Sequence, residues 1–193
     1  MNRLPIAVVL AGGKSIRMGR DKALCEMDGV RLIDRAVAAL RPQTGRILIS
    51  GPHDYGTGLE CVPDEQRGAG APCGGPSAGI FAVARRLAGE ATGFLTVPVD
   101  APFAPRDLAA RLRGPRSAVA SAGGRLHPTF AWWLIADIER AARDLEGGGN
   151  VSLRALAEAT KARVVPWADE TAFHNVNTAD DLMAAREKGL GGC

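Results

Sequence analysis

A short apolar run near the amino terminus constrains the fold more than any other feature of this sequence. Residues Ile6–Leu10 are apolar without a break, contain β-branched side chains and are followed at once by Ala11-Gly12-Gly13. A run this short that ends in glycines is typical of a strand buried on both faces. Such strands occur in parallel sheets that are covered by helices on both sides. The start of the chain therefore predicts an α/β fold.

Further strand-like runs alternate with segments whose apolar residues recur every three or four positions. This alternation predicts a single Rossmann-like, three-layer α/β domain with a mostly parallel sheet over residues 1–188, followed by a flexible tail over 189–193. The expected strands are 6–10, 46–50, 59–62, 94–99, 118–121, 129–134 and 162–167, and the expected helices are 32–40, 78–87, 135–145, 151–160, one that Pro105 opens and one that Thr178 and Asp181 cap.

The composition argues against several classes of protein. The chain has 193 residues, of which 46% are hydrophobic, so it can bury a full core and is not expected to be disordered. Its 24 Lys and Arg residues nearly balance 21 Asp and Glu, and they are scattered, which argues against a nucleic-acid partner. No apolar run is long enough to cross a bilayer and no signal peptide is evident, so we expect no membrane partner and a cytoplasmic location.

The cysteines and the tryptophans are assigned structural roles. The four cysteines show neither a C-x-x-C pair nor a nearby histidine at ligand spacing, so we interpret them as reduced thiols. Trp132, Trp133 and Trp167 lie in or at the ends of expected strands, which favours packing over stacking on a ligand. His127 precedes Pro128 at the start of an expected strand, and no proton-transfer role is assigned to it.

The loop after the first expected strand has the composition of a phosphate-binding segment. Gly12 and Gly13 allow backbone N–H groups to approach an anion closely, and Arg17 and Lys22 add cationic donors. The glycine spacing matches neither the P-loop nor the dinucleotide-binding fingerprint, which argues against a P-loop ATPase and an NAD enzyme. Lys14 lies in the same loop, and a lysine suits a phosphate that moves during a reaction; a solvated loop is the alternative interpretation.

Two carboxylates are expected at the carboxyl ends of strands, where ligands collect in open parallel sheets. Asp64 follows residues 59–62, and Asp100 follows residues 94–99 in a proline-rich turn. A carboxylate that faces a phosphate loop suits Mg²⁺, which prefers one or two protein carboxylates with phosphate oxygens and water. We therefore predict a metal-binding role for Asp100. A turn or helix-cap role is the alternative, and for Asp64 the two interpretations are equally supported.

Two amides, Asn175 and Asn177, precede the last expected helix. Because they are separated by one residue in an extended segment, their side chains point the same way and offer paired donors and acceptors to a heterocycle. A plain turn before a capped helix explains the pair equally well.

With these residues in place, the sequence resembles the molybdenum cofactor guanylyltransferase family, within the nucleotidyltransferase superfamily. The similarity covers nearly the whole chain. It departs at Ser77, where leucine is usual, at Ser50, where an asparagine often ends the second strand, and in the Gly- and Ala-rich stretch 67–75. The shared motifs are Leu10-Ala11-Gly12-Gly13 with Arg17-Met18-Gly19 and Asp21-Lys22, Gly75-Pro76-x-Ala78-Gly79, Pro98-x-Asp100-x-Pro102, His127-Pro128-Thr129 and Asn175-Val176-Asn177-Thr178.

The resemblance implies an enzyme that transfers GMP from GTP to the molybdopterin-bound molybdenum cofactor, with Mg²⁺ as cofactor, and releases pyrophosphate. Molybdoenzyme apoproteins or their chaperones are the further partners that it implies. Gly13 matches guanylyl members, whereas cytidylyl relatives tend to carry alanine there. The implied nucleotide-binding residues are Leu10, Ala11, Gly12, Gly13, Lys22, Asp64 and Asp100, the pterin-binding residues are Arg17, Gly79, Asn175 and Asn177, the metal ligand is Asp100, and the catalytic residues are Asp100, Lys22 and Arg17.

Two other functions fit the same residues. A nucleotidyltransferase that uses CTP or another phosphorylated acceptor would keep the loop and Asp100 but would change the base and acceptor pockets. A non-catalytic nucleotide sensor would bind GTP, release no pyrophosphate and expose a large apolar docking surface. The presence of both Lys22 and Asp100 argues against the sensor.

Overall fold

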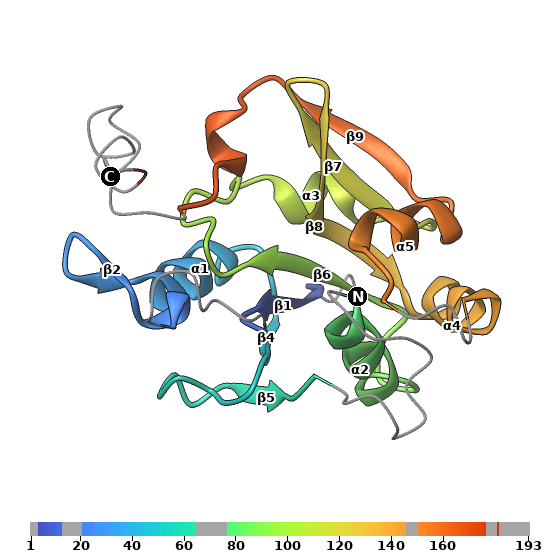
Figure 1. Ribbon diagram of the computed structural model, residues 1–193, viewed down its shortest axis with the longest axis horizontal. Helices are drawn as coiled ribbons and strands as arrows, with labels where there is room; N and C mark the ends of the chain where they lie inside the picture. Colours follow the sequence, from blue (N-terminus) through green and yellow to red (C-terminus); the bar gives the residue numbers. More distant parts are fainter. Residues whose placement is uncertain (1–3, 13–20, 65–76, 146–149, 177–180, 182–193) are drawn as a thin grey trace.

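The apolar run Ile6–Leu10 forms strand β1 in the interior of a seven-stranded sheet, as its composition predicts (Figure 1). The structure is a computed structural model that describes residues 4–12, 21–64, 77–145, 150–176 and 181. The other strands of this sheet are β4 (Arg46–Ser50), β5 (Glu60–Val62), β6 (Gly93–Pro98), β7 (Ala118–Ala122), β8 (Arg125–Leu134) and β9 (Arg163–Trp167). The helices are α1 (Leu32–Leu40), α2 (Ala78–Arg86), α3 (Leu108–Leu112), α4 (Ile135–Asp144) and α5 (Leu153–Ala159), with short 3₁₀ turns η2 (Lys22–Leu24) and η3 (Thr171–Phe173).

The sheet is mostly parallel, which confirms the predicted fold class. Its strand order is β5-β4-β1-β6-β8-β7-β9. Strands β5, β4, β1 and β6 run parallel, β8 is antiparallel to both β6 and β7, and β9 is parallel to β7. Leu10 at the end of β1 lies opposite Ser50 of β4 and Pro98 of β6. The carboxyl ends of these neighbouring strands therefore meet at one edge of the sheet.

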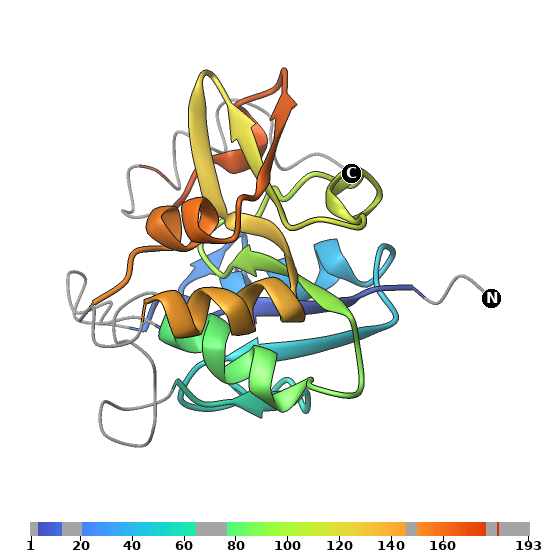
Figure 2. The ribbon, with the colours of Figure 1, turned by 90° about the vertical axis from the view of Figure 1, so that its right-hand side faces the viewer.

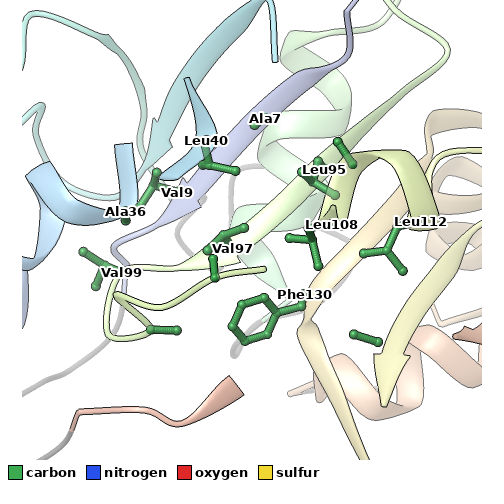
Figure 3. Packing of buried hydrophobic residues seen from close by; sticks show 14 of the residues in the cluster. Ala7, Val9, Ala36, Leu40, Leu95, Val97, Val99, Leu108, Leu112 and Phe130 are labelled. Atoms are coloured by element: carbon green, nitrogen blue, oxygen red, sulfur yellow. The ribbon is translucent and has the colours of Figure 1, made fainter. Parts of the chain in front are cut away.

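The two faces of β1 contact different hydrophobic layers, because successive side chains of a strand point to opposite sides. Ala7 and Val9 pack with α1 and α3 in the cluster drawn in Figure 3. Val8 packs on the other side with α2, α4 and α5, and α2 and α4 lie together on this face in Figure 2. All three side chains are fully buried. This helix–sheet–helix arrangement is the predicted three-layer architecture.

Two elements begin three or more residues from their expected positions, whereas the other expected boundaries within the described residues differ by at most two residues. Helix α3 begins at Leu108, because Pro105 lies in the preceding turn and its carbonyl accepts a hydrogen bond from the Leu108 N–H (3.3 Å). Strand β8 begins four residues earlier than expected and runs through Pro128, near which its register with β7 shifts. Proline has no N–H to donate to a ladder, so an irregularity in this part of the strand is the expected local response.

A short hairpin, β2 (Glu26–Met27) with β3 (Val30–Arg31), was not expected from the sequence. Its turn consists of Asp28 (φ 54°) and Gly29 (φ 73°), the Asp-Gly pair that two-residue hairpins favour. Its strands are only two residues long, so the alternating hydrophobic pattern that would mark a strand cannot develop.

The tryptophans pack in the core as expected, with Trp133 fully buried and its indole N–H donating to Thr96 Oγ1 (3.1 Å). Of the four cysteines, Cys25 and Cys61 are free thiols, and Cys73 and Cys193 lie outside the described residues. The capping residue Thr178 and the expected tail over 189–193 also lie outside them. Within the described part of the chain, none of the helices has the length and apolar character needed to span a membrane.

Candidate active site at the carboxyl edge of the sheet

The segment after β1 is held in place by the end of β4. The backbone N–H groups of Ala11 and Gly12 both donate to the carbonyl of Ser50 (2.8 Å each). Gly51 lies so close that a Cβ there would come within 3.2 Å of the Ala11 carbonyl carbon and 3.3 Å of the Gly12 nitrogen. These two N–H groups are therefore engaged by the protein, and the start of the predicted phosphate loop has a fixed backbone.

Asp64 brings together residues from three elements. A Cβ on Gly12 would collide with Asp64 Oδ2, and one on Gly79 would collide with Ser50 Oγ and Asp64 Oδ1, so a larger residue at either position would displace these side chains. Ser50 Oγ also donates to Asp64 Oδ1 (3.2 Å). Gly79 lies in the first turn of α2, and a carboxylate at a helix amino terminus is stabilised by the helix dipole. Gly12 and Asp64, which were predicted to bind the nucleotide, thus lie together with Gly79, which was predicted to bind the pterin.

Lys22 and Asp100 form an ion pair that joins the turn η2 to the segment after β6. Lys22 Nζ donates to Asp100 Oδ2 at 3.1 Å, although the residues are 78 positions apart in the sequence. Lys22 begins the turn η2, whose amino terminus is capped by Asp21, since Asp21 Oδ1 accepts from the Ala23 N–H (3.1 Å). Asp100 follows shortly after β6. The side chains of Lys22 and Asp100 are 18% and 14% exposed, so the pair is accessible from solvent.

Asp100 is the residue for which a metal-binding role was predicted. Its Oδ2 is paired with the Lys22 ammonium group at 3.1 Å, so a metal ion at this oxygen would compete with that lysine. Its carboxylate is a hard oxygen donor of the kind that Mg²⁺ prefers. The metal-binding role of Asp100 therefore stays a prediction, and no cluster of three or more potential metal ligands is found among the described residues.

Asn175, the first of the two predicted amides, lies on a segment that contacts the backbone of Asp100. The backbone N–H of Val176 donates to the Asp100 carbonyl (2.7 Å), so the neighbouring exposed residue Asn175 belongs to the same edge of the sheet. The remaining predicted site residues, Gly13, Arg17 and Asn177, lie outside the described residues, as does Lys14.

Tyr55 is a residue of this site that the sequence did not indicate. Its hydroxyl donates to the Ala11 carbonyl (3.2 Å), and its ring is almost fully buried. Burial and the nearby carboxylate of Asp21 raise the pKa of the phenol well above its usual range, so it stays protonated and can donate. Tyr55 thus contacts Ala11, and burial together with the charge of Asp21 raises the pKa of its phenol. Ala11 and Asp21 are the two ends of the segment 11–21.

His127 belongs to an aromatic cluster. Its ring lies 4.9 Å from the ring of Phe173, and Phe173 in turn packs against Phe130 and Trp167. Burial, followed by the charge of Arg125, lowers the pKa of the imidazole. The neutral, packed ring has a structural role in β8, and no proton-transfer role is assigned to it.

A groove of about 890 Å³ is lined by α1, the turn 102–107 and residues 167–172, and Lys22, Asp64 and Asp100 are not among its lining residues. None of its lining residues was predicted to bind a ligand. Its polar groups support the fold: Gln43 Nε2 donates to the Pro105 carbonyl (3.0 Å), and the Trp167 indole donates to Asp107 Oδ1 (3.1 Å). We therefore locate the candidate active site at the carboxyl edge of the sheet.

Solved structures share this fold. The molybdopterin-guanine dinucleotide biosynthesis protein A from Archaeoglobus fulgidus superposes with a TM-score of 0.72 at 20% identity, over 95% of this chain and 98% of its own. The 2-C-methyl-D-erythritol 4-phosphate cytidylyltransferase from Thermus thermophilus superposes with a TM-score of 0.64 at 22% identity, over 95% of this chain and 98% of its own. At these identities the likeness concerns the fold alone.

Sequence relatives are closer. The molybdenum cofactor guanylyltransferase of Acidiphilium cryptum (strain JF-5) is 40% identical over 187 residues, which cover 93% of this chain and 92% of the relative. The molybdenum cofactor guanylyltransferase of Rhizobium meliloti (strain 1021) is 38% identical over 204 residues, which cover 94% of this chain and 90% of the relative. Residues 7–179 match the family model described as the MobA-like NTP transferase domain. The chain is a nucleotidyltransferase and belongs to the MobA-like, molybdenum cofactor guanylyltransferase family.

Proposed function

We propose that this protein transfers GMP from GTP to the molybdopterin-bound molybdenum cofactor, which yields a guanine dinucleotide cofactor and pyrophosphate. The relatives that carry the guanylyltransferase name align over more than nine-tenths of this chain, which supports the choice of substrates. The observation that carries the proposal is the Lys22–Asp100 contact (3.1 Å), because a lysine beside a carboxylate is the combination that a phosphate and a metal ion would need.

The nucleotide would bind along Leu10, Ala11 and Gly12, beside Asp64 and with its phosphates near Lys22. The fixed backbone of Ala11 and Gly12 supports this role, because a preorganised surface loses little freedom when it binds a ligand. Gly13 and the catalytic cation Arg17 would extend the same segment. The lysine ammonium suits the phosphates as a mobile point charge.

Mg²⁺ would be held by Asp100 together with phosphate oxygens and water. When bound, it would neutralise the negative charge that develops on the phosphates during transfer. The pterin would lie on the side of Gly79 and Asn175, with Arg17 and Asn177. The short distance from Gly79 to Asp64 supports adjacent nucleotide and pterin subsites.

In the proposed reaction an oxygen of the pterin's terminal phosphate attacks the α-phosphorus of GTP. A new P–O bond forms while the bond from the α-phosphorus to the bridging oxygen of the β-phosphate breaks, and pyrophosphate leaves with that electron pair. The substrate supplies the nucleophile, so the protein needs no covalent intermediate. Its own residues act by positioning the reactants and by neutralising charge.

Three expectations stay predictions from the sequence. They are the cytoplasmic location, the division into a domain over 1–188 with a tail over 189–193, and delivery of the product to molybdoenzyme apoproteins or their chaperones.

The most direct test of the proposed function measures pyrophosphate release with GTP, CTP, ATP and UTP, each with and without the molybdopterin-bound cofactor. We expect release with GTP, and only when the acceptor is present. Faster release with CTP would support the cytidylyl alternative, and no release with any triphosphate would support the nucleotide sensor.

Replacing Asp100 by asparagine removes the charge of the metal ligand but keeps its shape. We expect Asp100→Asn to lower kcat by about 100-fold or more, because preorganised charge at a reacting phosphate contributes at least that much. Asp144→Asn, an exposed carboxylate at the end of α4, is the matched control and should keep full activity. Near-normal turnover by Asp100→Asn would remove Asp100 from the catalytic machinery.

Replacing Tyr55 by phenylalanine deletes only the hydroxyl that bonds to the Ala11 carbonyl. Because one hydrogen bond contributes about 1 kcal/mol net, we expect KM for GTP to rise about 2- to 10-fold with little change in kcat. Thr57→Val deletes a hydroxyl that bonds within the same loop, to the Asp54 carbonyl, and serves as control. An unchanged KM in Tyr55→Phe, or an equal rise in both variants, would contradict a positioning role for Tyr55.

A further inference from the structure

The ion pair between Lys22 and Asp100 occupies the same carboxylate that the proposed metal needs. Lys22 Nζ lies 3.1 Å from Asp100 Oδ2. In the proposed reaction this lysine also serves the phosphates. One ammonium group cannot bind the Asp100 carboxylate and the phosphates equally strongly at the same time. The contact between Lys22 and Asp100 must therefore weaken when substrate and metal bind.

Asp100 is the fixed member of the pair. The Val176 N–H donates to its carbonyl (2.7 Å), and the preceding Val99 N–H donates to the Leu10 carbonyl (3.1 Å). The backbone on which the carboxylate is mounted is thus tied both to the end of β1 and to the segment that carries Asn175. A carboxylate on a two-bond stem from such a backbone has little room to move.

Lys22 is the mobile member. Its backbone is fixed in η2 by the Asp21 cap, but its ammonium group is carried by a stem of four methylene groups. The side chain is partly exposed, so its Nζ can exchange one anionic partner for another without disturbing the turn. When a cation approaches Asp100, the lysine is therefore the group that moves.

On the basis of the proposed function, we infer that Lys22 holds Asp100 in the free protein and releases it only when a triphosphate supplies the lysine with a new partner. Mg²⁺ alone gains one carboxylate, loses part of a tightly held water shell and meets the repulsion of the ammonium group. A nucleoside triphosphate removes this obstacle, because its oxygens attract Lys22 and complete the metal's shell. Metal and nucleotide then bind as a coupled unit.

This coupling is reciprocal: a triphosphate that raises the affinity for the metal is itself bound more tightly when the metal is present. In the absence of nucleotide, the charge of Lys22 protects the carboxylate from free divalent cations. Removing the charge should open Asp100 to a metal ion alone.

The test measures Mn²⁺ binding to the full-length protein without nucleotide, from the loss of the electron paramagnetic resonance signal of free Mn²⁺. We expect Lys22→Met to bind Mn²⁺ about tenfold more tightly than the unmodified protein, within the usual range of coupling between sites. Lys22→Arg keeps the positive charge and should bind Mn²⁺ as weakly as the unmodified protein. A non-hydrolysable GTP analogue should strengthen Mn²⁺ binding in the unmodified protein more than in Lys22→Met.

Two controls locate the effect. Lys161→Met removes a positive charge before β9, at the edge of the sheet where β6 and β7 begin, and should leave Mn²⁺ binding unchanged. Adding Asp100→Asn to Lys22→Met should abolish the gain, because the gained metal is held by that carboxylate. Melting temperatures of all variants confirm that each is folded.

Equal Mn²⁺ affinity of Lys22→Met and the unmodified protein, both folded, would overturn the inference. So would an equal gain in Lys161→Met, since the effect would then come from net charge alone. Because these two outcomes are measured with metal alone, failure of the inference is distinct from failure of the proposed function, which is judged from pyrophosphate release.

Discussion

The burial of β1 between two parallel neighbours is the constraint on which the rest of the structure depends. Ala7, Val8 and Val9 are fully buried, and helices cover both faces of the strand. A strand with this composition is typical of the interior of a parallel sheet. Its register with β4 and β6 then places Leu10, Ser50 and Pro98 side by side, so the segments that follow these strands converge. The site is a consequence of that register.

Charge and close packing give the edge of the sheet its chemistry. One carboxylate, Asp64, fits against two glycine positions, and a second, Asp100, meets a lysine from the far end of the amino-terminal loop. The first contact lets backbone from the end of β1 and from α2 approach one carboxylate closely. The second holds a positive and a negative group side by side, which the proposed function assigns to phosphates and a metal. In the proposed function, these contacts preassemble the site, and the flexible side chain of Lys22 reorganises it when substrate binds.

Local sequence patterns were enough to predict the helices and strands. The features that were not predicted depend on contacts between residues that are far apart in the sequence. The ranges of β1, β4 and α1 match their prediction, because periodicity and flanking glycine or proline mark them within a few residues. Asp100 could be singled out because it directly follows an expected buried strand. Tyr55 was missed because its partner Ala11 is 44 residues away and a single tyrosine in a turn carries no pattern. The sharing of Asp64 by Gly12 and Gly79 likewise exists only after folding.

The central claim is that the metal and the triphosphate meet at the carboxyl edge between Lys22 and Asp100. A crystal structure of the protein with Mn²⁺ and a non-hydrolysable GTP analogue, with the anomalous signal of manganese recorded, tests it most directly. We predict a manganese peak bonded to the Asp100 carboxylate, with Lys22 Nζ moved from that carboxylate onto the phosphates. Manganese bound away from Asp100, or a nucleotide seated in the groove beside Trp167, would contradict the claim.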